Sequence, residues 1–209
     1  MPAGSIERTN ARREEILNAC EKLYETTNFK DITLKEIGKE TTFTRPSIYN
    51  YFHTKEEIFL GLLKREYDLW VDALNQAIRG SDRMTDAEIA DCIARTLSQR
   101  QLLLKLLSTN RDDLENHCRL EALVEFKTSF GQALATMAAL LSKFRPDLED
   151  AAIQEFLFTL FPLMFGIYPY TMVTDRQREA MSQAGVRYMY RSAYDLINKA
   201  VLKMLPARR

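Results

Sequence analysis

Hydrophobic residues recur at helical spacing along most of the chain. Between residues 55 and 77 the apolar side chains lie three or four positions apart, with polar side chains between them. This spacing predicts a long amphipathic helix, which Gly80 ends. The apolar residues of this helix are Ile58, Phe59, Leu62, Leu63, Tyr67, Trp70 and Leu74. Beyond Gly80 the pattern stays helical without a strand signal, so the chain is predicted to be all-α.

The same period predicts the remaining helices. The expected segments are 9–27, 85–97, 98–107, 111–143, 148–168 and 186–205, with a short turn of helix inside the polar segment 174–185. Together with the long helix and two short helices between residues 33 and 52, they make about nine helices. A hydrophobic content of 46%, with only seven Gly and six Pro, fits a compact helical protein.

Residues 33–55 contain two short helix patterns separated by a turn. Thr33 stands directly before the first pattern and Glu36 follows three residues later, which is the arrangement of a capping box. Thr44 is a suitable N-cap for the second helix, and Pro46 fits its first turn, where a backbone N–H has no intrahelical partner. The second helix is expected from about Arg45 to Tyr51. Two short capped helices around a tight turn are typical of a helix-turn-helix DNA reader.

The second helix has an unusual exposed face. Ile48 and Phe52 are four residues apart and are expected to face the core. On or beside the outer face lie Arg45, Pro46, Ser47, Tyr49, Asn50 and Tyr51. A DNA surface explains this set, because Arg reads guanine, Asn reads adenine, and Tyr hydroxyls contact phosphates. Any small helical hairpin with these caps stays open as an alternative.

Further polar residues flank the two helices. Lys35 points outward from the first helix, and His53 follows the second. Thr54 then caps the long helix, so that Lys55 and the free amides of its first turn can meet a phosphate. We include Lys35, His53 and Lys55 among the candidate DNA-binding residues.

The run I-T-L-K-E-I-G-K-E-T-T-F-T-R-P-S-I-Y-N-Y-F-H-T-K-E-E-I-F, preceded by R-R-E-E-I-L-N-A-C-E-K-L-Y-E, resembles the N-terminal domain of the tetracycline-repressor (TetR) family of bacterial transcription regulators. The resemblance covers about residues 9 to 60, and S-I-Y-N-Y-F-H-T-K-E-E is its most specific part. It implies base or groove contacts from Thr44, Arg45, Pro46, Ser47 and Asn50. It also implies phosphate contacts from Thr33, Tyr49, Tyr51 and Lys55.

Two positions depart from the family pattern. The turn usually carries Gly where this chain has Thr42, and the first short helix usually has Ala where this chain has Gly38. Thr disfavours a positive φ, so the turn is expected to differ in detail from that of the family.

The charge balance limits how DNA is bound. The chain has 29 basic and 29 acidic residues, so its formal net charge is zero. Residues 30–55 nevertheless hold five basic against three acidic side chains. Nucleic-acid modules are usually basic, so binding is expected to depend on a few placed side chains. The three cysteines form no close pairing motif and the N-terminus has no apolar signal segment, which points to the cytoplasm.

One stretch is long and apolar enough to suggest a membrane span. Residues 156–173 contain eighteen positions without a charge. Two prolines and a glycine interrupt the stretch, and no basic cluster flanks it. We therefore interpret it as a helix buried twice, once in its own core and once against a partner subunit.

The domains follow from this pattern. We expect a helix-turn-helix domain over residues 1–55 and a helical regulatory domain over residues 56–209. A short reading helix contacts few base pairs, so two copies about one turn of DNA apart are needed. The resemblance implies a homodimer through the last two long helices, here 148–168 and 186–205.

The regulatory domain is expected to bind a small apolar or aromatic molecule. Candidate pocket residues lie on helices that should converge, although aromatic and Met residues at this spacing also form ordinary cores. They are Tyr67, Trp70, Phe126, Phe130, Met137, Met164, Phe165 and Tyr168. Pro162 and Pro169 interrupt backbone bonding, which would allow a kink beside the cavity.

The favoured function is a repressor that leaves a palindromic double-stranded DNA operator when a small molecule binds. A transcriptional activator of the same fold and a helical protein-interaction module are the alternatives. An enzyme is not expected, because the two histidines, His53 and His117, have no evident catalytic partners. No cofactor is implied. His117 lies beside Cys118, but adjacent helical residues point about 100° apart and no metal ligand set follows.

Overall fold

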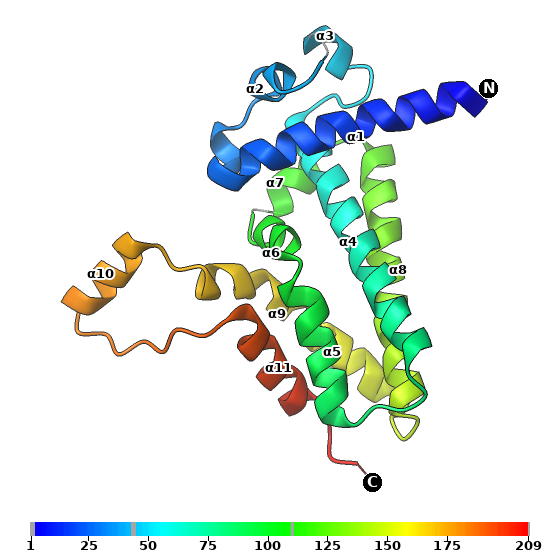
Figure 1. Ribbon diagram of the computed structural model, residues 1–209, viewed down its shortest axis with the longest axis vertical. Helices are drawn as coiled ribbons and strands as arrows, with labels where there is room; N and C mark the ends of the chain where they lie inside the picture. Colours follow the sequence, from blue (N-terminus) through cyan, green and yellow to red (C-terminus); the bar gives the residue numbers. More distant parts are fainter. Residues whose placement is uncertain (1–2, 43–44, 110, 209) are drawn as a thin grey trace. The chain divides into compact units, whose positions relative to one another are not determined.

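The computed structural model describes residues 3–42, 45–109 and 111–208. These residues form eleven α-helices and one 3₁₀-helix, and no strand occurs within the described ranges (Figure 1). The all-α prediction is confirmed, with more helices than the nine expected. The chain divides into two compact units. Unit 1 comprises Met1–Arg65 and Thr109–Ser129, and unit 2 comprises Glu66–Ser108 and Phe130–Arg209.

Unit 1 contains the short helices and the first parts of two long ones. Its elements are α1 (Ala3–Thr26), η1 (Phe29–Asp31), α2 (Leu34–Lys39), α3 (Arg45–Ile48), the start of α4 (Lys55–Gly80), α7 (Arg111–Asn116) and the start of α8 (Leu120–Phe144). At its core Phe59 forms T-shaped pairs with two rings, Tyr24 at 5.0 Å and Phe29 at 4.8 Å between centroids. Such T-shaped pairs bring the electropositive edge of one ring to the face of another.

Helices α1 and α4 approach closely at Gly61. A Cβ atom at this position would lie 2.9 Å from Cδ2 of Leu17. The buried faces of the two helices therefore meet where one of them has no side chain. This approach fixes the beginning of α4 against α1 within unit 1.

Unit 2 is built from the remaining helices. Its elements are the rest of α4 and α8 with α5 (Asp86–Ser98), α6 (Gln101–Leu107), α9 (Asp150–Thr171), α10 (Asp175–Gln183) and α11 (Ala193–Met204). Helix α11 packs on α5 and α9, and α6 packs on α9. Helix α5 starts with a complete capping box, in which Thr85 and Glu88 exchange bonds between side chain and backbone.

A buried arginine ties three segments of unit 2 together. The Arg145 guanidinium, at the end of α8, has no exposed surface. It donates to both carboxylate oxygens of Asp147 at 2.8 Å, to Asp86 at 3.2 Å and to the carbonyl of Pro206 at 3.0 Å. These charge-assisted bonds compensate for its burial. The Arg145 bond lowers the pKa of Asp147 to about 2.

The predicted helix over 111–143 is wrong in one respect. It is interrupted between α7 and α8, because backbone groups there bond to unit 1 side chains. The N–H of Arg119 donates to Glu57 at 3.1 Å, and the carbonyl of His117 accepts from the Thr54 hydroxyl at 3.0 Å. Tertiary bonds thus satisfy groups that a continuous helix would have paired internally.

Other predicted helices also differ at their ends. Helix α1 begins at Ala3 rather than Thr9, and the last helix begins at Ala193 rather than Val186, with Ser192 as its N-cap. Residues 175–183 form the separate helix α10, after which Gly185 takes a φ of 66°. This left-handed conformation favours Gly and ends the helix.

Helix α9 contains the uncharged stretch noted in the sequence. It is long and apolar enough to cross a membrane by length and composition, although a core helix of a folded protein passes the same test. The helix stays continuous through Pro162 and Pro169. Less than half of its most apolar eighteen-residue window is buried within the chain, so part of the α9 surface is left uncovered by the described residues.

Candidate nucleic-acid interface

The turn between α2 and α3 is held by α1. The Glu15 carboxylate accepts from the backbone N–H and from the hydroxyl of Thr42, both at 2.7 Å. The backbone bond, followed by the hydroxyl bond, lowers the pKa of Glu15. No non-Gly residue in the described ranges has a positive φ. The Thr at the usual Gly position is therefore accommodated by a side-chain bond, without a left-handed backbone.

The start of α2 shows one half of the predicted capping box, the bond to the Thr33 side chain. The Thr33 hydroxyl accepts from the N–H of Glu36 at 3.4 Å and also contacts the Glu36 carboxylate. Thr33 itself is exposed, as is Lys35 one residue inside the helix. Both side chains lie at the outer surface, where the DNA hypothesis requires them.

The second helix is shorter than predicted. Helix α3 covers Arg45–Ile48, and the chain continues as a turn to Tyr51, whose N–H donates to Ile48 at 2.8 Å. Ile48 and Phe52 are 0% and 2% exposed and anchor this segment, as predicted. Because both are buried, the residues between them are held at the surface.

These anchors bring several predicted residues to one outer face. Tyr49 is 40% exposed, Pro46, Asn50 and His53 are exposed, and Ser47 is half-buried. Thr44 and the side chain of Arg45 lie outside the described residues. Amide, phenol and imidazole groups are thereby presented together, and such groups bond to bases and phosphates.

The structure adds a basic residue that sequence reasoning missed. Nη1 of the exposed Arg12 on α1 donates to the hydroxyl of the half-buried Tyr51 at 3.4 Å. The neighbouring Arg13 lies over the Phe52 ring, at 4.8 Å from its centroid, and pairs with Glu125 at 3.0 Å. The only signal in the sequence was the Arg12–Arg13 pair. This pair lies almost forty residues before the reading segment, so the sequence did not indicate that Arg12 lies beside Tyr51.

Lys55 has intramolecular partners in this structure. Its Nζ atom donates to the carbonyls of Phe29 at 2.8 Å and Ile32 at 3.1 Å, and lies 4.3 Å from the centroid of the Phe29 ring. These contacts join the start of α4 to η1, just before the Thr33 cap. The lysine thus positions α2 as well as being a candidate phosphate ligand.

A buried carboxylate organises the turn that follows the reading segment. The Glu57 side chain is 1% exposed. It accepts from the N–H of His53 at 2.8 Å, from the N–H of Arg119 at 3.1 Å, and from Nε and Nη2 of Arg119 at 2.7 and 2.8 Å. Burial raises the pKa of Glu57, but the bonds from Arg119 and His53 outweigh it and lower the pKa to about 2.

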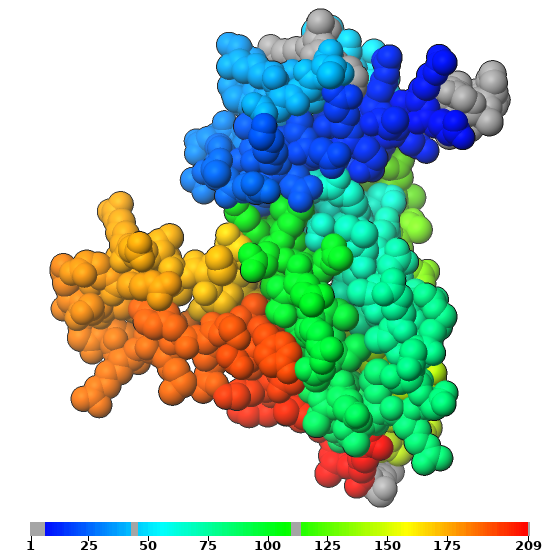
Figure 2. Space-filling view, in the orientation of Figure 1, coloured from blue at the N-terminus to red at the C-terminus, as the bar shows by residue number. Residues whose placement is uncertain are grey.

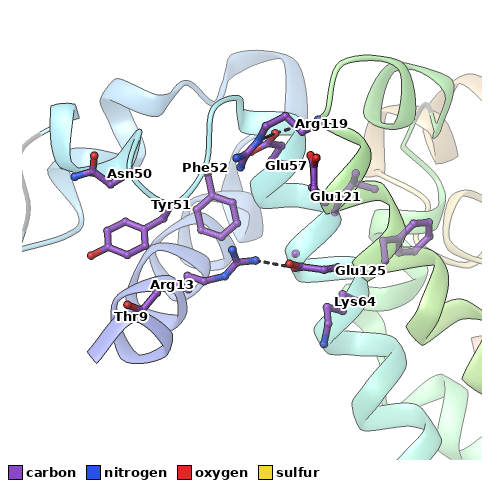
Figure 3. A pocket seen from close by; sticks show the side chains of 14 residues that line it. Thr9, Arg13, Asn50, Tyr51, Phe52, Glu57, Lys64, Arg119, Glu121 and Glu125 are labelled. Carbon is purple, nitrogen blue, oxygen red and sulfur yellow. Dashed lines mark hydrogen bonds and ion pairs between the residues drawn. The ribbon is translucent and has the colours of Figure 1, made fainter. Parts of the chain in front are cut away.

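A cavity of about 200 Å³ lies beside this turn in unit 1 (Figure 3). Its walls come from α1, the 50–52 turn, α4 and the start of α8, and Phe126 is among its apolar lining residues. The Arg13–Glu125 and Arg119–Glu57 ion pairs are among its lining residues, so each of these cations is paired with a carboxylate. The mixture gives the cavity no strong net charge.

The other ligand candidates occupy unit 2. Tyr67, Trp70, Met137 and Met164 are at most 1% exposed, whereas Phe165 and Tyr168 are half-buried. Phe130 stacks edge-on against Tyr67 at 5.7 Å and against Phe161 at 5.5 Å. The structure therefore brings Tyr67, Trp70 and Phe130 into one aromatic cluster, with Nε1 of Trp70 donating to the Thr96 hydroxyl at 3.2 Å.

Side chains that could bind a metal ion do not form a cluster in the part of the chain that the structure describes. Within the described ranges no set of three or more His, Cys, Asp or Glu residues is placed to hold a metal ion. Cys20 is buried, Cys92 and Cys118 are partly buried, and all three are free thiols.

Two family models match the chain. The model of bacterial regulatory proteins of the tetR family matches residues 16–62, and the model of the tetracyclin repressor-like C-terminal domain matches residues 64–201. No match was found among curated protein sequences.

Solved structures share the fold at low sequence identity. A TetR-family transcriptional regulator from Mesorhizobium loti has a TM-score of 0.61 and 16% identity, covering 94% of this chain and 97% of that one. Thermus thermophilus FadR in complex with lauroyl-CoA has a TM-score of 0.56 and 19% identity, covering 94% and 96%. Bacillus subtilis FadR in complex with stearoyl-CoA has a TM-score of 0.57 and 14% identity, covering 91% and 96%.

Proposed function

Because the chain belongs to the TetR family of ligand-responsive transcriptional regulators, we propose that it is a homodimeric repressor of a palindromic operator. Its reading surface is the α2–α3 segment with the turn to His53. The observation that carries this proposal is the exposure of Tyr49 and Asn50 between two buried anchors, Ile48 and Phe52.

Direct contacts divide by chemistry. We assign base or groove contacts to Thr44, Arg45, Pro46, Ser47 and Asn50, and phosphate contacts to Thr33, Tyr49, Tyr51 and Lys55. Arg12 adds a phosphate contact beside Tyr51, because its guanidinium already reaches the Tyr51 hydroxyl. With a formal net charge of zero, binding rests on these few groups rather than on a diffuse positive field.

The dimer supplies the spacing of two half-sites. A pair of reading heads about one DNA turn apart matches an operator with two-fold symmetry. The uncovered apolar face of α9 supports dimerisation through α9 and α11, because an exposed patch of this kind marks an interaction site.

The effector is proposed to be a small apolar or aromatic molecule that enters unit 2. The side chains that favour it are the aromatic cluster around Trp70 and the half-buried Phe165 and Tyr168. Two similar proteins of this fold were solved with acyl-CoA esters, and an acyl chain matches this chemistry. Release requires the effector to prefer a conformation in which the two reading heads no longer fit the half-sites. We propose that the protein carries out these steps in the cytoplasm as a regulator and not as an enzyme.

A mobility-shift assay on DNA from upstream of the gene tests the DNA-binding proposal. Wild type is expected to shift a fragment that contains an inverted repeat, and Tyr49→Ala with Asn50→Ala is expected to abolish the shift. Arg176→Ala, an exposed change on α10, serves as the control and should bind like wild type. Equal shifts for wild type and the double variant would contradict the assignment of Tyr49 and Asn50 to the reading surface. An activator of the same fold would show the same shift but raise transcription in a run-off assay.

A further inference from the structure

The uncovered face of α9 has a regular ridge. Phe158, Pro162, Gly166 and Tyr170 follow one another at intervals of four residues, so they form one row along the helix. Phe158 is 79% exposed and Tyr170 is 63% exposed. A Cβ atom at Gly166 would have no heavy atom within 4 Å. The row therefore has a large aromatic side chain at each end and a gap at Gly166, one turn before Tyr170.

The gap opens into an apolar groove of about 480 Å³. Its floor is the α9 surface around Gly166, and its wall is the returning segment 188–191 with Leu196 of α11. The Tyr188 hydroxyl donates to the carbonyl of Tyr170 at 3.3 Å and holds this wall against the end of α9. Figure 2 shows residues 175–191, in orange, projecting at this side of unit 2. Cavities of about 150 Å³ accommodate a benzene ring, so a phenyl side chain fits.

Pro162 lies midway between Phe158, the knob, and Gly166, the floor of the groove. Phe158 precedes Pro162 by four residues and Gly166 follows it by four. When two copies of α9 cross antiparallel at Pro162, the Phe158 of each copy meets the Gly166 of the other. A parallel pair would instead place knob against knob and groove against groove, leaving both grooves empty. Two-fold symmetry requires the same patch on both copies to complement itself, and only the antiparallel pair does so.

The amount of apolar surface and the charges agree with a second copy as the occupant. A stable interface buries roughly 800 Å² per partner, and each aromatic side chain contributes up to about 150–250 Å². Phe158 and Tyr170 with the exposed Met172 and Met189 supply much of that area. Arg191 lines the groove, and the exposed Glu155 lies three residues before Phe158 on the entering helix. Arg191 of one copy is thus positioned to form an ion pair with Glu155 of the second copy.

We propose that Phe158 of each copy fills the groove above Gly166 of a second copy, with the two α9 helices antiparallel. This inference rests on the proposed homodimer and specifies its register. The segment from Val186 to Arg191 then covers the partner's knob, which gives a function to a part of the chain that packs little within its own subunit. The ridge of small residues at Pro162 and Gly166 allows the helices to approach closely.

Disulfide trapping tests the register. In the full-length chain with its three native cysteines replaced, Phe158→Cys combined with Gly166→Cys is expected to give a dimer that resists denaturation without reductant. Disulfides require Cα atoms within about 7 Å. The control pair, Ala151→Cys with Gly166→Cys, moves one partner along the helix by about 10 Å and should stay monomeric on the denaturing gel. Cross-linking of the control pair alone would overturn the proposal.

Two further measurements separate this inference from the proposed homodimer. Sedimentation of the wild-type chain at micromolar concentration reports the dimer itself, so a monomer would contradict the proposed function. A wild-type dimer without a 158–166 cross-link would overturn only the register. Phe158→Ala is expected to weaken dimerisation by at least about 30-fold, the loss expected of an interface anchor. Leu69→Ala, at a residue 39% exposed on α4, is the matched control and should leave the dimerisation constant unchanged. Equal weakening of dimerisation by Phe158→Ala and Leu69→Ala would contradict the proposal.

Discussion

Glu57 and Arg119 are 62 positions apart in the chain and form a hydrogen-bonded ion pair. The carboxylate of Glu57 receives two side-chain bonds and one backbone bond from Arg119, and a fourth bond from the backbone of His53. His53 is the last residue of the reading segment, and Arg119 precedes α8. The pair therefore fixes the exit of the DNA-reading segment to the start of a long helix within unit 1.

Removing the charge of Glu57 is expected to weaken both folding and DNA binding. Glu57→Gln keeps the shape but loses charge-assisted bonds to a partner that is partly exposed, so we expect the free energy of unfolding to fall by about 2 kcal/mol. The loosened 50–53 turn should also weaken operator binding. Urea denaturation and a binding titration measure the two effects. Glu56→Gln, one residue away, is the control and should change neither by more than about 0.5 kcal/mol.

The same pair predicts a pH dependence. The pKa of Glu57 is about 2 in the folded protein, below its ordinary value of 4.5. A carboxyl with a lowered folded pKa stabilises the fold fully above its unfolded pKa, and this contribution is lost as the pH falls from 4.5 toward 2. The stability difference between wild type and Glu57→Gln should therefore shrink between pH 5.5 and pH 3 in urea denaturation. A difference that grows on acidification would contradict the assignment.

Arg145 is expected to be the most sensitive charged residue of unit 2. Arg145→Ala leaves Asp86 and Asp147 without their buried partner, and breaking such a group costs about 3–5 kcal/mol of unfolding free energy. Arg208→Ala removes a half-exposed bond to the same Asp86 and should cost less than about 1 kcal/mol. Thermal unfolding of both variants makes the comparison. Similar losses from the two would show that burial of Arg145 is unimportant.

Lys55 and Tyr49 should separate structural from direct effects on DNA binding. The Lys55 ammonium bonds to the carbonyls of Phe29 and Ile32, so Lys55→Ala is expected to lower the melting temperature and the DNA affinity together. Tyr49 is exposed, so Tyr49→Ala should lower the affinity and leave the melting temperature within a degree or two. Calorimetry with a binding titration checks both. A Lys55→Ala protein of unchanged stability would mean that these carbonyl bonds contribute little.

Local signals predicted much of the fold. The Thr33 cap, the long helix from Lys55 to Gly80 and the buried pair Ile48 and Phe52 all follow from residues close together in sequence. Periodicity needs no tertiary information to identify such features.

The errors arose where distant residues decide the structure. The break between α7 and α8 depends on Glu57 and Thr54, more than sixty residues earlier, and a helical period across 111–143 contains no trace of them. The position of Arg12 beside Tyr51 likewise depends on how α1 packs. Contacts between distant segments override the local helix preference at such points. The pattern of a single sequence does not show which distant side chains will bond there.

The central claim, that the face between Ile48 and Phe52 reads DNA, is tested most directly by fluorescence anisotropy on a labelled operator duplex. Wild type and Tyr49→Ala with Asn50→Ala are titrated at one salt concentration, after matched melting temperatures have been verified. We expect at least about a 30-fold weaker affinity for the double variant, since two direct contacts of about 1–3 kcal/mol each are lost. Equal dissociation constants for the two proteins would contradict it.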